Sequence, residues 1–378
     1  MNAEMKWMTA DEYPELLPFL DRAFGFDPER NGFLTFLPKL YRREAEPWKY
    51  NLAVRDPETG ALNAVLGIYP LSLLVAGRSL SCAALGNMGV DERARGRGLM
   101  TTLMQEAVSR CLAAGYDLAV LGGQRQRYAP FGFEPTGADR VFRLTAANFR
   151  HCFGKTPNDV TVRPVTATDP VLREIKALHD AQPFCAKRDD ERFYDILLSW
   201  NEVPYAAFRG DALIGYYLRK GSEIREPVLR DPEDLFPVLR AAQGGTGDLQ
   251  LALAPWETGL CLRAAAIAEE AGRMQWEKYA VFRFVPVLQA LLSLIAAERV
   301  PDDGSLTVRV EPGETLTVTV RNGVPTVCKS SAPPDLILSY PEAMAFFFSD
   351  FSPARLTCSS PVRWLFPLPL ALRMADHA

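Results

Sequence analysis

The sequence contains 378 residues, of which 48% are hydrophobic and 23% are charged, and its formal net charge is -4. This length predicts two or three domains, and the composition is typical of an ordinary soluble globular protein. The small negative charge gives no reason to expect nucleic acid or an anionic membrane as a partner. No stretch reaches the roughly 18 apolar residues that a membrane span requires.

The cysteines and histidines exclude several kinds of chemistry. Seven cysteines are scattered without a C-x-x-C pair, and the N-terminal segment lacks the apolar core of a secretory signal. We therefore expect reduced thiols and a cytoplasmic location. None of the three histidines, His151, His179 and His377, has another possible metal ligand at the sequence spacing that metal sites use. Neither a metal cofactor nor a Ser-His-Asp triad is expected.

The first predicted domain, residues 1–150, mixes helices with strands. A helical pattern at Tyr13–Phe24 precedes strand-like runs, and the turn Pro57-Glu58-Thr59-Gly60 between two of them favours a hairpin. A further helix and a buried strand-like run follow. This alternation indicates an α/β domain. The strand-like runs are 51–55, 61–74, 79–89 and 118–121.

The second predicted domain, residues 151–286, repeats that order of elements. A strand-like run is followed by two helical patterns, a hairpin around Arg209-Gly210-Asp211, and a strand that leads into a helix. We therefore predict a duplicated fold whose second copy is degenerate, because it has lost the active loop of the first. The strand-like runs are 161–165, 205–208, 213–218 and 248–253, and the helical patterns are 170–181, 189–200 and 260–271.

The third predicted domain, residues 287–378, has the pattern of a small α+β unit. A helical pattern precedes two alternating strands, and Asn322-Gly323 is a strong hairpin signal before a third. A fourth strand and an aromatic-rich helix follow. The helical patterns are 287–297 and 340–348, and the strand-like runs are 305–311, 315–321, 325–329 and 336–339.

The chemistry is carried by a basic, glycine-containing loop in the first domain. The segment Arg93-Ala94-Arg95-Gly96-Arg97-Gly98 follows a strand and precedes a predicted helix. Glycines let the backbone approach an anion closely, a helix start offers free N–H groups, and arginines add charge-assisted hydrogen bonds. The loop is therefore predicted to bind a pyrophosphate. The apolar face of the helix comprises Leu99, Met100, Leu103, Met104, Ala107, Val108, Cys111 and Leu112.

Two other phosphate-binding motifs do not fit this loop. It contains no Gly-Lys-Ser/Thr sequence, so it is not a P-loop, and no third glycine completes G-x-G-x-x-G. The spacing R-x-x-G-x-G of Arg93, Gly96 and Gly98 instead resembles the coenzyme A motif of the GCN5-related N-acetyltransferase superfamily. The resemblance implies acetyl-CoA as co-substrate and tandem acetyltransferase-like mixed sheets flanked by helices.

A second motif narrows the resemblance. The pattern Tyr-x-x-Phe-Gly-Phe-x-Pro runs from Tyr128 to Pro135, and it resembles the end of the catalytic domain in the enhanced-intracellular-survival (Eis-like) acetyltransferases. Those proteins have two acetyltransferase-like domains and a small C-terminal α+β domain like a sterol carrier protein, which matches the three predicted domains. The resemblance also implies a homo-oligomer, specifically a hexamer.

The resemblance implies roles for individual residues. Tyr128 would protonate the leaving thiolate, since a phenol with a pKa of about 10 keeps its proton at neutral pH. The terminal carboxylate of Ala378 would accept the proton of the amine. The strand end would pair with the pantetheine amides, the loop would cover the pyrophosphate, and a downstream segment would line the cofactor. These binding residues are Met88, Gly89, Val90, Arg93, Arg95, Gly96, Arg97, Gly98, Leu99, Met100, Thr101, Gly123 and Gln124.

Several alternatives stay open at this point. Tyr128 can instead be a packing residue, and the tail does not end in the aromatic residue that the resemblance leads us to expect. Asp376 or His377 can therefore replace Ala378 as the base, or the tail can be disordered. The aromatic helix 340–348 suits a lipid cavity or an ordinary core.

The predicted function is acetyl-CoA-dependent N-acetylation of a small-molecule amine or of lysine side chains. An aminoglycoside or a polyamine is the kind of cationic acceptor envisaged, with transfer through a tetrahedral intermediate. One alternative is a catalytically idle fold that binds a lipid or a protein. A second is a transferase of longer acyl chains.

Overall fold

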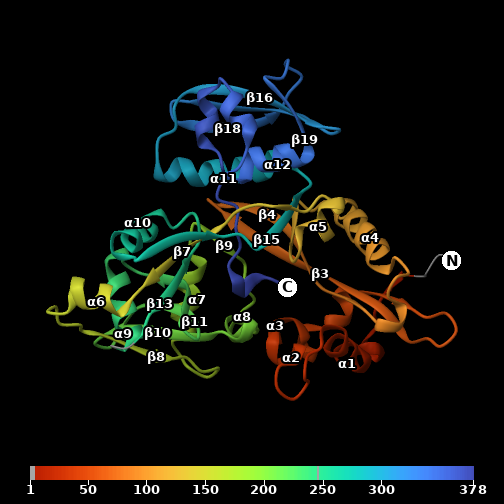
Figure 1. Cartoon of the computed structure of the whole chain (residues 1–378), viewed down its shortest axis with the longest axis horizontal. Coiled ribbons are helices and arrows are strands. Elements are labelled where there is room, and N and C mark those ends of the chain that lie inside the picture. The colour runs from red at the N-terminus through yellow and green to blue at the C-terminus, as the bar shows by residue number, and fades with distance from the viewer. Residues whose placement is uncertain (1–4, 245–246) are drawn as a thin grey trace. The chain divides into compact units, whose positions relative to one another are not determined.

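The computed structural model describes residues 5–244 and 247–378, which form two compact units (Figure 1). The first unit comprises the chain up to Thr136, Trp276–Leu368 and His377–Ala378. The second comprises Gly137–Gln275 and Pro369–Asp376. The chain thus passes between units after Thr136 and after Gln275, whereas the sequence predicted boundaries after residues 150 and 286.

The first unit contains a mixed sheet in the order β1-β2-β3-β4-β5-β15-β6. Neighbouring strands along this order are antiparallel, except for the parallel pair of β4 and β5 at its centre. The strands are β1 (Met5–Trp7), β2 (Asn51–Arg55), β3 (Leu62–Val75), β4 (Arg78–Val90), β5 (Leu118–Gly122), β6 (Glu134–Pro135) and β15 (Glu277–Val281).

Helices α1 and α4 cover opposite sides of the central strands of this sheet (Figure 1). Each buries one apolar stripe, as expected for an amphipathic helix that packs on a sheet. In α4 the buried residues are Leu99, Leu103, Met104, Ala107 and Cys111. The helices of this region are α1 (Tyr13–Phe24), α2 (Phe33–Phe36), α3 (Pro38–Tyr41), α4 (Leu99–Ala113) and α5 (Arg125–Tyr128).

The second unit repeats this topology with the order β14-β7-β13-β12-β11-β10-β8, again with one parallel pair, β12 and β13. The strands are β7 (Asp139–Leu144), β8 (Val160–Pro164), β9 (Phe184–Ala186), β10 (Val203–Arg209), β11 (Ala212–Lys220), β12 (Glu223–Leu229), β13 (Leu249–Leu253) and β14 (Glu270–Met274). The helices are α6 (Ala146–Phe153), α7 (Leu172–Asp180), α8 (Phe193–Leu198), α9 (Leu235–Gln243) and α10 (Thr258–Ile267). The predicted duplication of mixed sheets is therefore present.

The two repeats exchange one strand each. β7 follows the first repeat along the chain but pairs with β13 and β14 in the second sheet. β15 follows the second repeat but pairs with β5 and β6 in the first sheet. This exchange explains why the observed boundaries differ from those that the order of elements suggested.

The C-terminal region contains a four-stranded sheet in the order β18-β17-β16-β19. Alternating residues of its strands are buried, such as Leu306, Val308 and Val310, which is the pattern of a sheet with one covered face. The strands are β16 (Gly304–Glu311), β17 (Thr315–Arg321), β18 (Val324–Lys329) and β19 (Leu336–Ser339), and the helices are α11 (Phe284–Glu298), α12 (Tyr340–Phe348) and α13 (Pro353–Thr357). Its likeness to a sterol carrier stays a prediction.

Two predicted helices are wrong in part. The helix predicted at 260–271 ends at Ile267, because Ala268 is extended, and β14 begins at Glu270. β14 is an exposed edge strand and carries no alternating apolar signal. The helix predicted at 189–200 is reduced to α8, and Trp200 after it has a φ of 68°.

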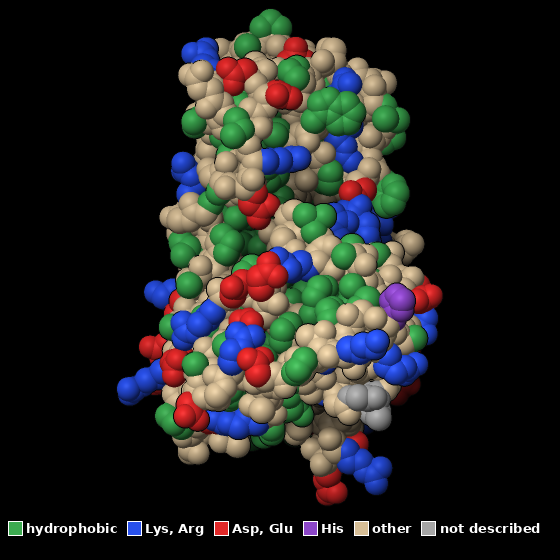
Figure 2. Space-filling model, turned by 90° about the vertical axis from the view of Figure 1, so that its left-hand side faces the viewer, with side chains coloured by type: hydrophobic (Ala, Val, Ile, Leu, Met, Phe, Trp, Pro, Cys, Tyr) green, Lys and Arg blue, Asp and Glu red, His purple; other side chains and the backbone are tan. Residues whose placement is uncertain are grey.

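The described residues include no helix that is both long and apolar enough to cross a bilayer. On the face shown in Figure 2, acidic and basic side chains are interspersed. All seven cysteines are free thiols, and Cys152 and Cys328 among them are exposed.

Candidate active site

The centre of the first sheet opens at the ends of its two parallel strands. The register of β4 and β5 joins Cys82–Ala84 to Leu118–Val120, while β4 continues to Val90 and β5 to Gly122. The two strands therefore part beyond Ala84. An opening at the carboxyl ends of parallel strands is a common place for a ligand in an α/β sheet.

A β-bulge lies on the β4 side of this opening. Val65 pairs with Gly89 and Gly67 with Gly86, so Asn87 and Met88 lie opposite one β3 residue. Such a bulge leaves a residue outside the ladder and bends the strand. Met88 therefore lies in the bulge, and Gly89 and Val90 follow it in regular pairing with Val65 and Ala64.

Asn87 adopts the left-handed conformation that the bulge requires, with a φ of 45°. Its side-chain amide donates to Asn51 Oδ1 at 2.7 Å. Gly67 makes room for it, because a Cβ at Gly67 would lie 2.2 Å from Asn87 Oδ1. Burial raises the pKa of the nearby Tyr69 to about 12, so Tyr69 stays neutral in this hydrogen-bonded group.

The basic loop follows β4 and leads into α4, as predicted. Gly96 and Gly98 have φ values of 79° and 74°, and no atom lies within 4 Å of the position of a Cβ on either residue. Arg93, Arg95 and Arg97 are exposed, and none of them forms an ion pair with a carboxylate in the described part of the chain. The open backbone, the helix start and the unneutralised charge fit a pyrophosphate.

Tyr128 lies at the end of α5 in the apolar cluster that includes Leu85 of β4 and Leu99 of α4. Met88, Val90 and Met100 pack against the same cluster. The predicted strand, loop and tyrosine are thus brought together. Burial raises the pKa of Tyr128, and the neighbouring Arg127 opposes that shift. The phenol is therefore protonated at neutral pH.

Gly123 and Gln124 lie between β5 and Tyr128. Gly123 has a φ of 136°, and a Cβ there would lie 2.5 Å from Cε2 of the Tyr128 ring. Glycine is therefore needed at this position for the ring to pack where it does. Gln124 precedes the first residue of α5.

Ala378 lies beside the opening. A Cβ on Gly86 would lie 2.9 Å from the carboxyl carbon of Ala378 and 3.1 Å from one of its oxygens. Ala378 is partly exposed, whereas His377 before it is buried. The terminus thus lies beside β4, at the residue that precedes the bulge.

His377 is held by acidic and aromatic residues of the segment that contains β15. Its Nε2 lies 2.5 Å from Glu277 Oε1, and the hydroxyl of Tyr279 donates to the other oxygen of Glu277. The His377 ring packs on Trp276 with centroids 4.4 Å apart. His377 and Glu277 are 2% and 4% exposed, so His377 is engaged in holding the terminus.

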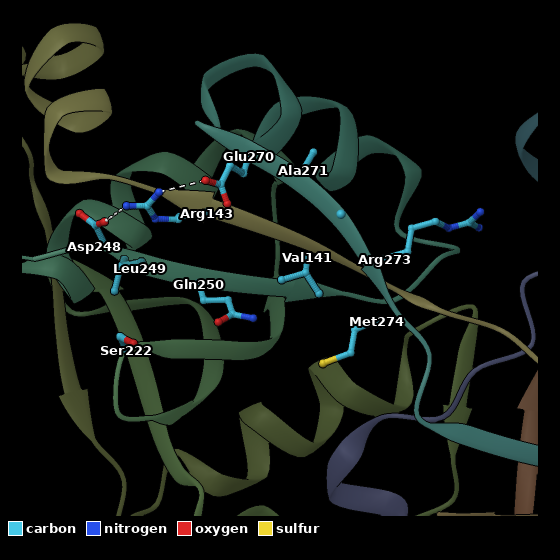
Figure 3. Close-up of a pocket in the computed structure, with 11 residues that line it drawn as sticks. Val141, Arg143, Ser222, Asp248, Leu249, Gln250, Glu270, Ala271, Arg273 and Met274 are labelled. Carbon is cyan, nitrogen blue, oxygen red and sulfur yellow. Dashed lines mark hydrogen bonds and ion pairs between the residues drawn. The ribbon is translucent and has the colours of Figure 1, made fainter. Parts of the chain in front are cut away.

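A separate groove of about 500 Å³ lies on the sheet of the second unit. Arg143 and Arg273 both line this groove, and Arg143 lies between Asp248 and Glu270 at 2.9 and 3.1 Å (Figure 3). The charge of Arg143 is thus paired with these two carboxylates. Within residues 5–244 and 247–378, no group of three or more His, Cys, Asp or Glu side chains is arranged to hold a metal ion.

The mixed sheet with its opened centre, its bulge and its basic loop at a helix start defines an α/β protein of the acyltransferase class. The comparisons agree, since residues 4–136 match the family model described as the acetyltransferase (GNAT) domain. This part of the chain therefore matches the GNAT acetyltransferase domain, a fold that uses acetyl-CoA or another acyl-CoA.

Three solved structures are similar over nearly the whole chain. A GCN5-related N-acetyltransferase from Kribbella flavida is 16% identical, and the match has a TM-score of 0.65. The match covers 91% of this chain and 88% of that protein's chain. One from Anabaena variabilis ATCC 29413 is 14% identical, with coverages of 94% and 93% and a TM-score of 0.66. Eis1 from Mycobacterium abscessus is 15% identical, with coverages of 94% and 92% and a TM-score of 0.63. These likenesses confirm the predicted fold. A search of curated proteins found no match.

Sequence reasoning missed Asn87, Glu277 and the part that Trp276 plays. A positive-φ residue at a bulge is suggested only by an asparagine between glycines, Gly86 and Gly89, which is a weak signal. Glu277 lies in a strand whose five residues are all buried. A glutamate there needs a partner, but the sequence does not say that the partner is His377.

Proposed function

We propose that the protein is an acetyl-CoA-dependent N-acetyltransferase that transfers the acetyl group directly to an amine. The acceptor class is a cationic small molecule, such as an aminoglycoside or a polyamine, or a lysine side chain. One observation carries this proposal: the carboxyl group of Ala378 lies beside Gly86, where β4 parts from β5. A carboxylate at this opening attracts an ammonium group and accepts its proton.

The cofactor would lie along the opening, with its pyrophosphate on the basic loop. Gly96 and Gly98 supply the open backbone, and the first N–H groups of α4, from Leu99 to Thr101, have no partner within the helix. Arg93, Arg95 and Arg97 supply positive charge. Met88, Gly89 and Val90 would pair with the pantetheine amides, and Gly123 and Gln124 would line the other side.

In the reaction, the ammonium group first loses one proton to solvent by way of the Ala378 carboxylate. The neutral amine then attacks the thioester carbonyl, so an N–C bond forms and an oxyanion develops. A backbone N–H of the β4 bulge would stabilise that oxyanion. The Ala378 carboxylate takes the proton that the amine nitrogen loses. The C–S bond then breaks, and Tyr128 gives its phenolic proton to the thiolate of CoA. The proton on the carboxylic acid replaces the one that Tyr128 gave, by way of solvent.

The proposal is tested by a panel of amines with acetyl-CoA. Release of free thiol is followed together with the mass of the acceptor, because thiol release alone also reports hydrolysis. We expect thiol and acetylated amine in equal amounts. Hydrolysis alone would contradict transfer to an amine, and no turnover with any amine would leave a catalytically idle fold as the better explanation. Longer acyl-CoA donors in the same assay test the chain-length preference.

A further inference from the structure

The second repeat contains the same opening and the same bulge as the first. β12 pairs with β13 through Glu223, Ile224 and Arg225. In β12, Glu226 and Pro227 lie opposite one residue of β11, and Glu226 has a φ of 48°. Glu226 thus stands where Asn87, with a φ of 45°, stands in the first repeat.

The loop after this opening is unsuited to a phosphate. Where the first repeat has Arg93-Ala94-Arg95-Gly96-Arg97-Gly98, the second has Leu229-Arg230-Asp231-Pro232-Glu233-Asp234 before α9. This loop has no glycine and three carboxylates. Without glycines the backbone cannot approach phosphate oxygens closely, and Pro232 removes one N–H donor, so we do not expect a second acyl-CoA site here.

The C-terminal tail lies in this opening instead. Arg188 donates to both carboxylate oxygens of Glu226, at 2.6 and 2.8 Å, and to both of Asp376, at 2.8 and 3.1 Å. The hydroxyl of Tyr216 donates to Glu226 at 2.7 Å. All three charged side chains are at most 3% exposed. One guanidinium therefore joins the bulge residue of β12 to the tail.

Glu226 is ionised at neutral pH. Burial alone would raise the pKa of Glu226, but Arg188, with help from His179, brings it well below its usual value. Removing Arg188 would leave two buried carboxylates without their common partner, which is strongly unfavourable. The tail is thus held by an interaction that fails if the guanidinium is lost.

A second anchor lies three residues earlier in the tail. Arg373 donates to both oxygens of Glu257, at 2.9 and 3.1 Å, and lies over the Trp256 ring at 5.6 Å. Ala375 between the anchors is fully buried in an apolar cluster of this unit. The remaining cavity beside Arg373 measures about 20 Å³, which suits one water molecule and no ligand.

We infer that the second repeat has become a clamp for the tail, and that Arg188 is a positioning residue for the carboxylate of Ala378. This inference rests on the proposed function. Asp376 is two residues before Ala378, and two residues span at most about 7 Å. Fixing Asp376 therefore confines the terminal carboxylate to a small volume. A misplacement of about 1 Å can lower a rate on the order of 100-fold.

The test uses Asp376→Asn and Arg188→Met in the full chain, with Arg188→Lys as the conservative variant. Arg230→Met is the matched control, because Arg230 pairs with the exposed Glu174 in the same unit. We expect kcat to fall at least about 10-fold in Asp376→Asn and Arg188→Met, with partial recovery in Arg188→Lys. The Kd for acetyl-CoA should stay within about twofold, because the cofactor site belongs to the first repeat.

Two further measurements follow the tail and the cofactor site independently of acetylation. Carboxypeptidase digestion followed by mass spectrometry should trim the tail faster in Asp376→Asn than in the parent, whether or not any amine is acetylated. Calorimetric titration with acetyl-CoA should give one site per chain. If the tail is released but kcat is unchanged, Arg188 is not a positioning residue. If Asp376→Asn leaves the tail protected, the clamp is wrong. A parent with a protected tail and no transferase activity would instead contradict the proposed function alone.

Discussion

The carboxyl carbon of Ala378 lies in contact with Gly86: a methyl group added to Gly86 would come within 2.9 Å of it. The last residue of the chain thus rests on the strand residue that precedes the β4 bulge. Any side chain at Gly86 must displace the terminus, and this makes Gly86 a sensitive probe of the proposed base.

Gly86→Ala should lower kcat by about 10-fold or more, because the added Cβ moves the carboxylate away from the acceptor. Gly272→Ala is the matched control, since Gly272 is also a strand residue and no atom lies within 4 Å of its Cβ position. Steady-state kinetics of both variants check this. Equal kcat values for the two would show that the position of the terminus does not matter.

Tyr128→Phe should lower kcat by on the order of 100-fold, the usual contribution of a general acid. Burial raises the pKa of Tyr128, so the parent rate should not fall near neutral pH through loss of the phenolic proton. Acetyl-CoA affinity should be unchanged, because the ring remains. Tyr194→Phe, which removes one hydrogen bond to Val165, is the control. A kcat for Tyr128→Phe close to that of the control would mean that Tyr128 only packs.

Gly96→Glu should weaken acetyl-CoA binding by at least about 100-fold, because it places a carboxylate among three arginines and a side chain at a φ of 79°. Gly60→Glu is matched to it, with a φ of 72° and equally open surroundings in a turn of the same unit. Isothermal titration measures both affinities. Unchanged affinity in Gly96→Glu would contradict the assignment of the loop.

Stability should depend on pH through Glu202. Burial raises the pKa of this carboxyl to about 7, against an opposing effect of Arg225. An unfolded glutamate loses its proton near pH 4.3, so the folded state binds more protons between these values. The contribution of Glu202 to the free energy of unfolding therefore falls as pH rises through this window, by roughly 4 kcal/mol in total.

Glu202→Gln should remove that dependence. Urea unfolding at pH 5 and pH 8 measures it, with the exposed Glu174→Gln as control. We subtract the parent's free energy of unfolding from that of Glu202→Gln at each pH. This difference should be larger at pH 8 than at pH 5, by about 1–3 kcal/mol. The same difference at both pH values would show that Glu202 is ionised when folded.

Local pattern was enough to predict most elements of the fold. The helix at Tyr13–Phe24 and the strand at Asn51–Arg55 have the predicted bounds, because a regular apolar period is a property of adjacent residues. β12 was missed although it is central to its sheet. Its charged Arg225 and Glu226 and its Pro227 break the alternation that marks a strand. Their partners, such as Arg188, lie far away along the chain.

The residues of the candidate site also fall into those that local pattern predicts and those that it does not. The basic loop and the Tyr128 motif are contiguous in sequence, so they could be predicted. The exchange of β7 and β15, the contact of Ala378 with Gly86 and the pairing of Glu277 with His377 depend on long-range packing, which local pattern does not encode. The hexamer, the cytoplasmic location and the sterol-carrier likeness stay predictions.

The role of Ala378 as the base can be tested by changing only its carboxyl group. The 378-residue chain can be prepared with Ala378 as a free carboxylate or as the terminal amide, which differs only in the group proposed as the base. We predict that the amide form binds acetyl-CoA with unchanged affinity but acetylates amines at least about 100-fold more slowly. An amide form with the same kcat as the carboxylate form would contradict the role of Ala378 as the base.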